Sequence, residues 1–209
     1  MTDQGLTAKV YDDSDNFEID PFELFQEWFE EAKSTEINDP GAMTVASVDA
    51  SGMPDARILL LNGHDQGGFV FFTNLESTKG SQLEANAKAA AVFHWKSLRR
   101  QVRIRGTVEH VSDEQADAYF ATRPLGSRIG AHASQQSRPL ESREVLLERT
   151  KELEKKFGQN VPRPKHWSGY RIVPLEIEFW KNGEFRLHDR VVFRRAGIHD
   201  PWERVRLNP

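Results

Sequence analysis

The chain has 209 residues, of which 38% are hydrophobic and 29% charged, and its formal net charge is −4. This size and composition fit a single globular domain and exclude a largely disordered protein. The acidic balance provides no general attraction for nucleic acid or an acidic membrane surface, so any anion site must be local. The absence of cysteine excludes disulfides and thiol nucleophiles, and no histidine pair has metal-binding spacing, so we expect no metal site.

Two features of the sequence bear on location and domain boundaries. The longest apolar runs, such as residues 89–93, are too short to span a bilayer, and the N-terminus lacks a signal-peptide pattern. We therefore expect a cytoplasmic protein that does not bind membranes. Residues 1–19 are acidic and poorly patterned, which predicts a mobile tail, and residues 20–209 are expected to form one domain.

Helical and strand periodicities follow one another along the rest of the chain. Asp20 and Pro21 are typical of a helix N-cap and first turn, and apolar residues follow at helical spacing to Ala32. The other predicted helices span residues 77–87, 112–122 and 142–157. The predicted strands span residues 43–49, 56–62, 69–74, 91–95, 101–111, 170–180, 186–194 and 202–207. This order predicts a mainly β protein of the α+β class, in which a closed antiparallel sheet carries peripheral helices.

A β-hairpin is predicted where Asn182-Gly183 separates two strands, because both residues of a type I′ turn need a positive φ. The predicted register places Trp180 opposite Phe185. The return strand then has an apolar face and a cationic face. The apolar face carries Phe185, Leu187, Val191 and Phe193, and the cationic face carries Arg186, His188, Arg190 and Arg194. Such a cationic face is suited to an anion site, and it is equally typical of the solvated outer side of a sheet.

Two further groups of residues have chemistry suited to anions. Five cations lie within residues 95–105, which is typical of a nucleic-acid patch or of a solvated strand edge. Tyr119, Arg123 and Ser127 recur at intervals of four residues. An arginine beside a phenol and a hydroxyl suits a phosphate group, whereas a helix face closed by a Pro-Gly turn explains the same spacing without a ligand.

The residues around the predicted hairpin resemble the signature of the pyridoxamine 5′-phosphate oxidase family. They read Glu178-Phe179-Trp180, a short turn, and Arg186-Leu187-His188-Asp189-Arg190, and the end of the chain, Arg206-Leu207-Asn208-Pro209, is similar to the family's C-terminus. The resemblance extends upstream to about Asp20. It implies an FMN-binding split β-barrel and a homodimer with FMN between the subunits. It also implies oxidation of pyridoxamine 5′-phosphate or pyridoxine 5′-phosphate, both B6 vitamers, to pyridoxal 5′-phosphate, with O2 as electron acceptor and H2O2 as product.

The resemblance also implies roles for individual residues. The implied FMN-binding residues are Arg57, Ile58, Leu59, Leu60, Leu61, Asn62, Phe72, Thr73, Thr78, Lys79, Gln101, Gln136, Ser137, Trp180 and Arg190. The implied substrate-binding residues are Asn62, Tyr119, Arg123, Ser127, Arg186, Leu187 and His188, and Arg186 and His188 are the implied catalytic pair. Lys79 is expected at the start of a short helix, where backbone N–H groups and a cation together favour phosphate.

Two positions depart from the family pattern. Asn62 stands where the family places a lysine that contacts the substrate phosphate, and Thr78 stands where it places an arginine. Each change removes a charge-assisted hydrogen bond, worth roughly 1.5–3 kcal/mol. The missing lysine leaves two alternatives open. One is a related flavin oxidase acting on another small aromatic such as a phenazine precursor, and the other is a non-catalytic protein that binds FMN or pyridoxal phosphate.

Overall fold

The computed structural model describes residues 5–12 and 18–209. Over these residues, nine strands form one sheet in the order β2-β1-β5-β6-β7-β4-β3, and β8 pairs with both β7 and β9. The strands are β1 (Ala42–Val48), β2 (Pro54–Leu60), β3 (Gly63–Asp65), β4 (Gly68–Asn74), β5 (Lys88–Trp95), β6 (Arg100–His110), β7 (Trp167–Lys181), β8 (Asp189–Arg194) and β9 (Glu203–Arg206). The helices are α1 (Leu6–Val10), α2 (Pro21–Thr35), α3 (Thr78–Ala85), α4 (Asp113–Thr122), α5 (Leu125–Ala133) and α6 (Arg143–Phe157), and a 3-10 turn covers Glu184–Arg186.

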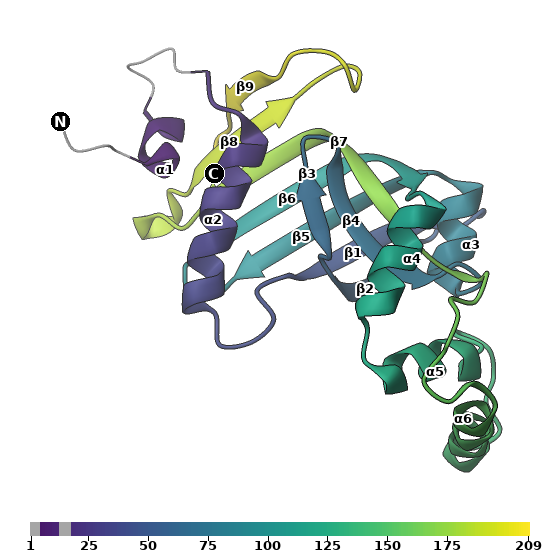
Figure 1. Ribbon diagram of the computed structural model, residues 1–209. Coiled ribbons are helices and arrows are strands. Elements are labelled where there is room, and N and C mark those ends of the chain that lie inside the picture. The colour runs from purple at the N-terminus through teal and green to yellow at the C-terminus, as the bar shows by residue number, and fades with distance from the viewer. Residues whose placement is uncertain (1–4, 13–17) are drawn as a thin grey trace.

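Strand β7 organises the sheet because it is long enough to pair with three other strands. Its residues 167–172 pair with β4, its residues 176–181 pair with β8, and β6 runs along its other edge, all antiparallel. The register of the β6–β7 pair shifts between Arg105 and Gly106, and such an irregularity increases the local twist. The sheet curls into an open, split barrel (Figure 1). The predicted fold class, a mainly antiparallel split β-barrel with peripheral helices, is confirmed.

Helix α2 covers the barrel with an aromatic stripe, as its helical spacing predicts. Asp20 caps the first turn by accepting hydrogen bonds from two backbone N–H groups. Phe25 lies edge-on to Phe69 of β4 with ring centroids 4.8 Å apart, and Trp28 lies edge-on to Phe179 of β7 at 5.1 Å. Full burial of a phenylalanine side chain contributes roughly 1.5–3 kcal/mol, so this stripe fixes α2 on the sheet.

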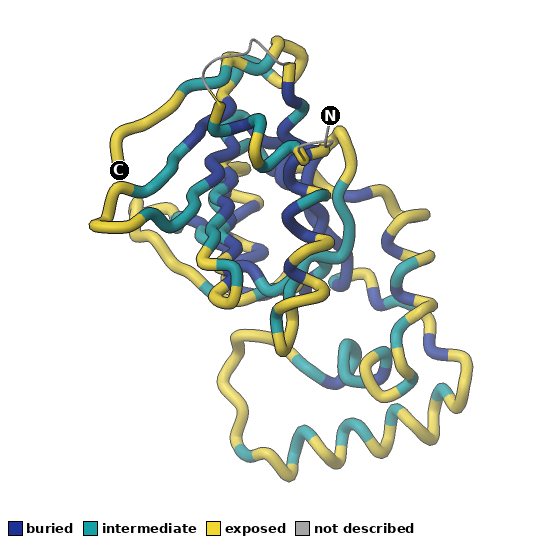
Figure 2. The backbone as a smooth tube through the Cα atoms, turned by 90° about the vertical axis from the view of Figure 1, so that its left-hand side faces the viewer, coloured by how far each residue is buried: buried dark blue, intermediate teal, exposed yellow. Residues whose placement is uncertain are grey.

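A second hydrophobic cluster attaches the helices that follow β6 to the sheet. Phe120 of α4 and Ile129 of α5 pack with Val161 and with Trp167 of β7. Helix α5 is not predicted, because Pro124 and two glycines disfavour a helix locally, yet the packing of Ile129 stabilises it. Helices α5 and α6 extend away from the barrel, and α6 contains no buried residue (Figures 1 and 2). The cluster therefore holds α4 beside the sheet, where several predicted substrate residues lie.

The N-terminal helix differs from the predicted mobile tail. The N–H groups of Leu6 and Thr7 donate hydrogen bonds to the carboxylate of Glu27 on α2, at 2.8 and 3.0 Å. Val10 is 1% exposed, so α1 is packed onto the domain. A five-residue helix is too short for periodicity to reveal, and its partner Glu27 is distant in the sequence. Residues 1–4 and 13–17 of the predicted tail lie outside the described residues.

The connection between β7 and β8 is longer than the predicted type I′ turn. Gly183 has a φ of −118° and a ψ of 157°, and the positive φ values occur later, at Phe185 (53°) and Arg186 (65°). The prediction of a type I′ turn is therefore wrong. A glycine is required for another reason, because a Cβ at Gly183 would overlap the carbonyl oxygen of Leu187.

This longer loop also changes the predicted register. Trp180 lies opposite Arg190 and not opposite Phe185. Of the four residues predicted on the apolar face, Val191 and Phe193 are buried, whereas Phe185 and Leu187 are 90% and 70% exposed. The remaining predicted helices and strands are confirmed with small shifts at their ends, and the short strand β3 is an addition. Within the described ranges, no helix has both the length and the apolar character that crossing a membrane requires.

Candidate active site

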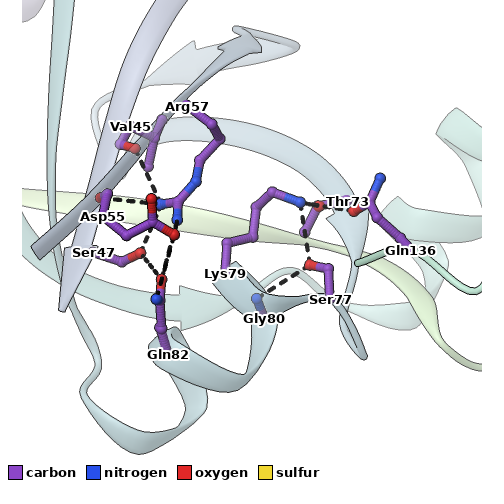
Figure 3. Close-up of polar contacts among 10 residues, drawn as sticks. All are labelled: Val45, Ser47, Asp55, Arg57, Thr73, Ser77, Lys79, Gly80, Gln82 and Gln136. Carbon is purple, nitrogen blue, oxygen red and sulfur yellow. Dashed lines mark hydrogen bonds and ion pairs between the residues drawn. The ribbon is translucent and has the colours of Figure 1, made fainter. Parts of the chain in front are cut away.

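Lys79 lies in the first turn of α3, surrounded by neutral oxygen atoms (Figure 3). It is 9% exposed, and Ser77 caps the helix. The Nζ of Lys79 donates hydrogen bonds to Thr73 Oγ1 at 2.9 Å, Ser77 Oγ at 3.1 Å and Gln136 Oε1 at 2.7 Å. None of these acceptors carries a charge, so they solvate the lysine cation without neutralising it.

Arg57 on β2 forms a second polar network beside the same helix. Its Nη1 donates to Ser47 Oγ at 2.7 Å, and its Nη2 donates to Gln82 Oε1 at 3.1 Å and to the Asp55 carboxylate at 2.5 Å (Figure 3). Gln82 belongs to α3, so the guanidinium joins β1 and β2 to the helix that carries Lys79. Asp55 is about half exposed, which weakens its ion pair with Arg57 through solvent screening.

The electrostatics of this pocket favour an anion. Burial, and to a smaller extent the nearby positive charge of Arg57, lower the pKa of Lys79 from its ordinary 10.5 to about 8. The N-terminal end of a helix adds partial positive charge from its backbone N–H groups. A phosphate group fits this donor set, because it would accept hydrogen bonds from the lysine and supply the missing negative charge. The other predicted residues here, Thr78 and Ser137, are exposed.

Three aromatic rings stack near the end of β2. The ring of Phe72 is parallel to that of Tyr119, with centroids 4.2 Å apart and an angle of 9°, and to that of Trp167 at 5.3 Å and 2°. The guanidinium of Arg123 lies over the Trp167 ring at 4.7 Å. The stack brings β4, α4 and β7 together, and it orders Tyr119 and Arg123, two of the three predicted phosphate ligands.

Arg123 has a donor that the described residues do not satisfy. Its Nη1 is buried, and no hydrogen-bond partner for it lies within the described residues. Burial lowers the pKa of this guanidinium. A buried donor without an acceptor costs roughly 1–3 kcal/mol, which an anionic ligand would offset. Ser127, the third predicted ligand, is exposed on α5, and Pro124 is the N-cap of that helix and not part of a Pro-Gly turn.

Asn62 joins the end of β2 to the aromatic stack. Its Nδ2 donates a hydrogen bond to the hydroxyl oxygen of Tyr119 at 2.5 Å. Its Oδ1 accepts one from the N–H of Phe72 at 3.1 Å. The residue that replaces the family lysine is therefore bonded to a predicted phosphate ligand, and it connects the two groups of site residues carried by β2 and β4.

Gln101, Trp180 and Arg190 form one row across β6, β7 and β8. Beside this row, the buried carboxylate of Glu178 accepts hydrogen bonds from Arg190 Nε at 2.9 Å and from Arg103 Nη1 at 2.8 Å. Glu178 is 2% exposed, and its hydrogen bond raises the pKa of Arg190. Two arginines thus neutralise one buried carboxylate, which fixes Arg190 next to Trp180.

The implied catalytic pair lies in the loop before β8. The ring of His188 contacts that of Trp180, with centroids 4.6 Å apart. His188 Nδ1 accepts a hydrogen bond from the N–H of Gly183 at 3.2 Å, which places the proton of a neutral ring on Nε2. Arg186 and Leu187 are exposed. The structure therefore holds the imidazole in a defined orientation and leaves the guanidinium accessible.

One protomer does not pair these two groups of residues directly. Thr73, which binds Lys79, pairs with Ser168 near the start of β7, whereas Trp180 lies near the other end of that strand, roughly 40 Å away along an extended strand. On β2 and the residue that follows it, Leu59 and Leu61 pack against the core, whereas Ile58 and Leu60 are 63% and 51% exposed. The predicted phosphate pocket around Lys79 and the signature loop are thus two separate predicted half-sites within one chain, and an apolar strand surface adjoins the first.

The basic stretch at residues 95–105 belongs to the sheet. Arg100 pairs with Glu31 at 2.5 Å, Arg103 with Glu178 at 2.8 Å, and Arg105 with Glu176 at 3.5 Å. Carboxylate partners for these three arginines favour the strand-edge interpretation over a nucleic-acid patch.

Sequence reasoning missed four residues that shape the site, namely Ser47, Gln82, Trp167 and Glu178. Glu178 lies two residues before Trp180 on β7, so strand periodicity could have placed both side chains on the same face of the sheet. Ser47 and Gln82 hold Arg57 from positions distant in the sequence, and Trp167 stacks on a ring contributed by another strand. No local pattern reveals such contacts.

Comparison with known proteins connects this geometry to a family. A family model described as pyridoxamine 5′-phosphate oxidase matches residues 29–157, and a model of the pyridoxine 5′-phosphate oxidase C-terminal dimerisation region matches residues 167–209. The chain belongs to the pyridoxamine 5′-phosphate oxidase family. Two similar members of the family are the pyridoxine/pyridoxamine 5′-phosphate oxidases of Allorhizobium ampelinum and Caulobacter vibrioides. The first is 55% identical over 100% of both chains, and the second is 60% identical over 92% of this chain and 86% of the relative.

Two solved structures share the fold of this chain. PhzG from Burkholderia lata, in complex with tetrahydrophenazine-1-carboxylic acid, has a TM-score of 0.87 and 30% identity, covering 95% of this chain and 96% of PhzG. A pyridoxamine 5′-phosphate oxidase-related, FMN-binding protein from Nostoc punctiforme has a TM-score of 0.75 and 15% identity. The match covers 92% of this chain and 100% of the Nostoc chain. The second likeness concerns the fold alone.

Proposed function

We propose that this chain is an FMN-dependent oxidase that forms pyridoxal 5′-phosphate from pyridoxine 5′-phosphate or pyridoxamine 5′-phosphate. Pyridoxine 5′-phosphate and O2 give pyridoxal 5′-phosphate and H2O2, and the pyridoxamine compound also consumes water and releases ammonia. The observation that carries this proposal is identity of 53–60% with pyridoxine/pyridoxamine 5′-phosphate oxidases over most or all of the chain.

The phosphate of FMN is assigned to the pocket at the start of α3. Lys79 and Arg57 would bind it, and the neutral hydrogen-bonding partners of Lys79 leave that charge to be matched by a ligand. Gln101, Trp180 and Arg190 are assigned to the flavin ring, which their common row supports. Bound FMN supplies the two-electron acceptor that amino-acid side chains lack.

The protein forms a homodimer through its C-terminal region, which matches a family dimerisation model. We place FMN between the two subunits. The separation of the two half-sites within one chain, roughly 40 Å along β7, supports this placement, because a second subunit would supply the missing half. The exposed apolar side chains of Ile58 and Leu60 would be covered in the same interface.

The substrate is assigned to residues from both half-sites. Tyr119, Arg123 and Ser127 would bind its phosphate, and the unsatisfied Nη1 of Arg123 supports an anion there. In the loop before β8, Leu187 would contact the substrate, Arg186 would stabilise developing negative charge, and the Nε2–H of His188 would orient the substrate by donating a hydrogen bond.

An anaerobic titration tests this function. The purified yellow protein is mixed with pyridoxine 5′-phosphate without oxygen, and the visible flavin bands are recorded. Loss of these bands, followed by their return and by H2O2 release on admitting air, is the expected result. A protein that cannot take up FMN contradicts the whole proposal.

A second candidate is oxidation of a phenazine precursor, which the likeness to PhzG and the missing lysine at Asn62 favour. The lower identity of PhzG, 30%, places this candidate behind the B6 vitamers. The same titration would select this candidate if the flavin bands are lost with tetrahydrophenazine-1-carboxylic acid but not with pyridoxine 5′-phosphate. Bands that persist with both substrates would instead favour a non-catalytic binding protein.

A further inference from the structure

The amide of Asn62 can adopt one orientation only. Its Oδ1 faces the N–H of Phe72 at 3.1 Å, and a backbone N–H can only donate. The Nδ2 group must therefore face Tyr119, whose hydroxyl oxygen lies 2.5 Å away. Exchanging the amide oxygen and nitrogen would place two donors against each other at Phe72, so the direction of both hydrogen bonds is fixed.

This direction determines what the hydroxyl of Tyr119 can do. Because its oxygen accepts from Asn62, its own proton must point elsewhere, toward a further acceptor. The ring cannot turn away, since it stacks on Phe72 at 4.2 Å and is parallel to it within 9°. Arg123, four residues later at the C-terminal end of α4, contributes a buried Nη1 that no described residue satisfies. Two donors for which the described residues show no acceptor, the Tyr119 hydroxyl and Arg123 Nη1, are thus carried by neighbouring turns of the chain.

We propose that Asn62 is a positioning residue, which fixes the hydroxyl of Tyr119 as a hydrogen-bond donor to the phosphate of the substrate. The proposal rests on the proposed function. It gives a definite role to the residue that replaces the family lysine, because the chain has an oriented neutral donor where the family pattern has a cation. The phosphate subsite then selects a ligand group that only accepts hydrogen bonds, and it depends less on net charge.

A double-mutant cycle with Tyr119→Phe and Asn62→Ala tests the proposal on the FMN-loaded protein. We measure KM and kcat for pyridoxamine 5′-phosphate and, independently of turnover, the dissociation constant of pyridoxal 5′-phosphate by absorbance titration. Each single variant should raise KM and the dissociation constant roughly 10- to 100-fold, as for loss of a hydrogen bond to a charged group. The kcat should change less than about threefold, because the phosphate is remote from the reacting carbon. In the Tyr119→Phe background, Asn62→Ala should add less than about twofold.

Asn62→Asp provides an isosteric test that preserves the acceptor for Phe72 and hence the local fold. Its carboxylate would accept the Tyr119 proton and reverse the hydrogen bond. The added negative charge repels the phosphate equally with and without the Tyr119 hydroxyl, so any further loss must come from the reversed hydrogen bond. Asn62→Asp should therefore weaken pyridoxal 5′-phosphate binding at least about fivefold more when Tyr119 is present than in the Tyr119→Phe protein. Asn160→Asp, at an exposed position after α6, is the matched control and should leave binding unchanged.

The outcomes separate this inference from the proposed function. Equal effects of the Asn62 variants in both backgrounds would show that the amide acts independently of Tyr119 and would overturn the inference. So would a fall in kcat with unchanged KM. A wild-type protein whose flavin bands are not lost with pyridoxine 5′-phosphate would instead contradict the proposed function.

Discussion

Lys79 in the pocket at α3 and Arg186 in the loop before β8 are cations held in opposite ways. Lys79 is 9% exposed and donates hydrogen bonds to three side chains, so its position is set before any ligand binds. Arg186 is exposed and has a φ of 65°, a conformation that non-glycine residues adopt rarely. Under the proposed function, one chain would complete the phosphate pocket, whereas the reacting end would depend on a ligand and a second subunit. Affinity for FMN and turnover should therefore respond to different residues.

Arg186→Ala is expected to have the largest effect, and only on turnover. The variant should lose about 100-fold or more in kcat/KM, because it removes a charged contact to the reacting substrate. It should keep FMN and lose less than about 0.5 kcal/mol of stability, since the side chain is exposed. Steady-state kinetics and thermal unfolding measure both, with Arg143→Ala on the exposed face of α6 as control. Normal turnover in Arg186→Ala would remove this residue from the reaction.

Lys79→Met should have the converse effect. The dissociation constant for FMN should rise roughly 10- to 100-fold, as expected for losing a charged hydrogen bond to phosphate. The FMN-free protein should lose no stability at neutral pH, because burial makes the charged form of Lys79 unfavourable, as its lowered pKa indicates. Flavin fluorescence titration gives the affinity, and Lys151→Met on α6 is the matched control. If Lys79→Met binds FMN like the wild type, the phosphate lies elsewhere.

Glu178→Gln probes the link between the flavin row and the strand core. The substitution keeps the shape but leaves Arg103 and Arg190 without their shared counter-charge, which should cost roughly 1–3 kcal/mol of unfolding free energy. The melting temperature should fall by several degrees, about 2–4 °C per kcal/mol for a chain of this size. Glu152→Gln on α6 should have no effect. An unchanged melting temperature would mean that solvent already screens the buried pair.

The pH dependence of FMN binding gives the smallest and most specific test. Burial lowers the pKa of Lys79 to about 8 in the FMN-free protein, and under the proposed function phosphate would bind the protonated lysine. FMN affinity should be constant just below pH 8 and should fall about tenfold per pH unit above it. In the FMN-free protein, stability should rise between about pH 8 and 10.5, because there the unfolded chain holds the proton more tightly than the folded one. Lys79→Met should abolish both trends.

The elements that the sequence predicts well are those specified by neighbours in the chain. Asp20 and the apolar stripe define α2, and Ser77 caps α3 as expected. The hairpin prediction failed because the glycine at Gly183 serves a close backbone approach, which only the folded loop creates. The bond between Asn62 and Tyr119 spans 57 residues, so no local pattern reveals it. Resemblance could name both residues but could not show that one orients the other.

Strand β7 carries Trp167 of the aromatic stack near one end and Trp180 near the other, roughly 40 Å apart along an extended strand. If FMN lies between subunits, the two ends of this strand serve two different flavins. Each flavin then takes its phosphate contacts from one chain and its reacting loop from the other. Lys79→Met, which should bind FMN poorly, and Arg186→Ala, which should turn over poorly, should therefore complement each other at limiting FMN. When their subunits are exchanged, each mixed dimer regains one fully wild-type site, and the other site carries both defects.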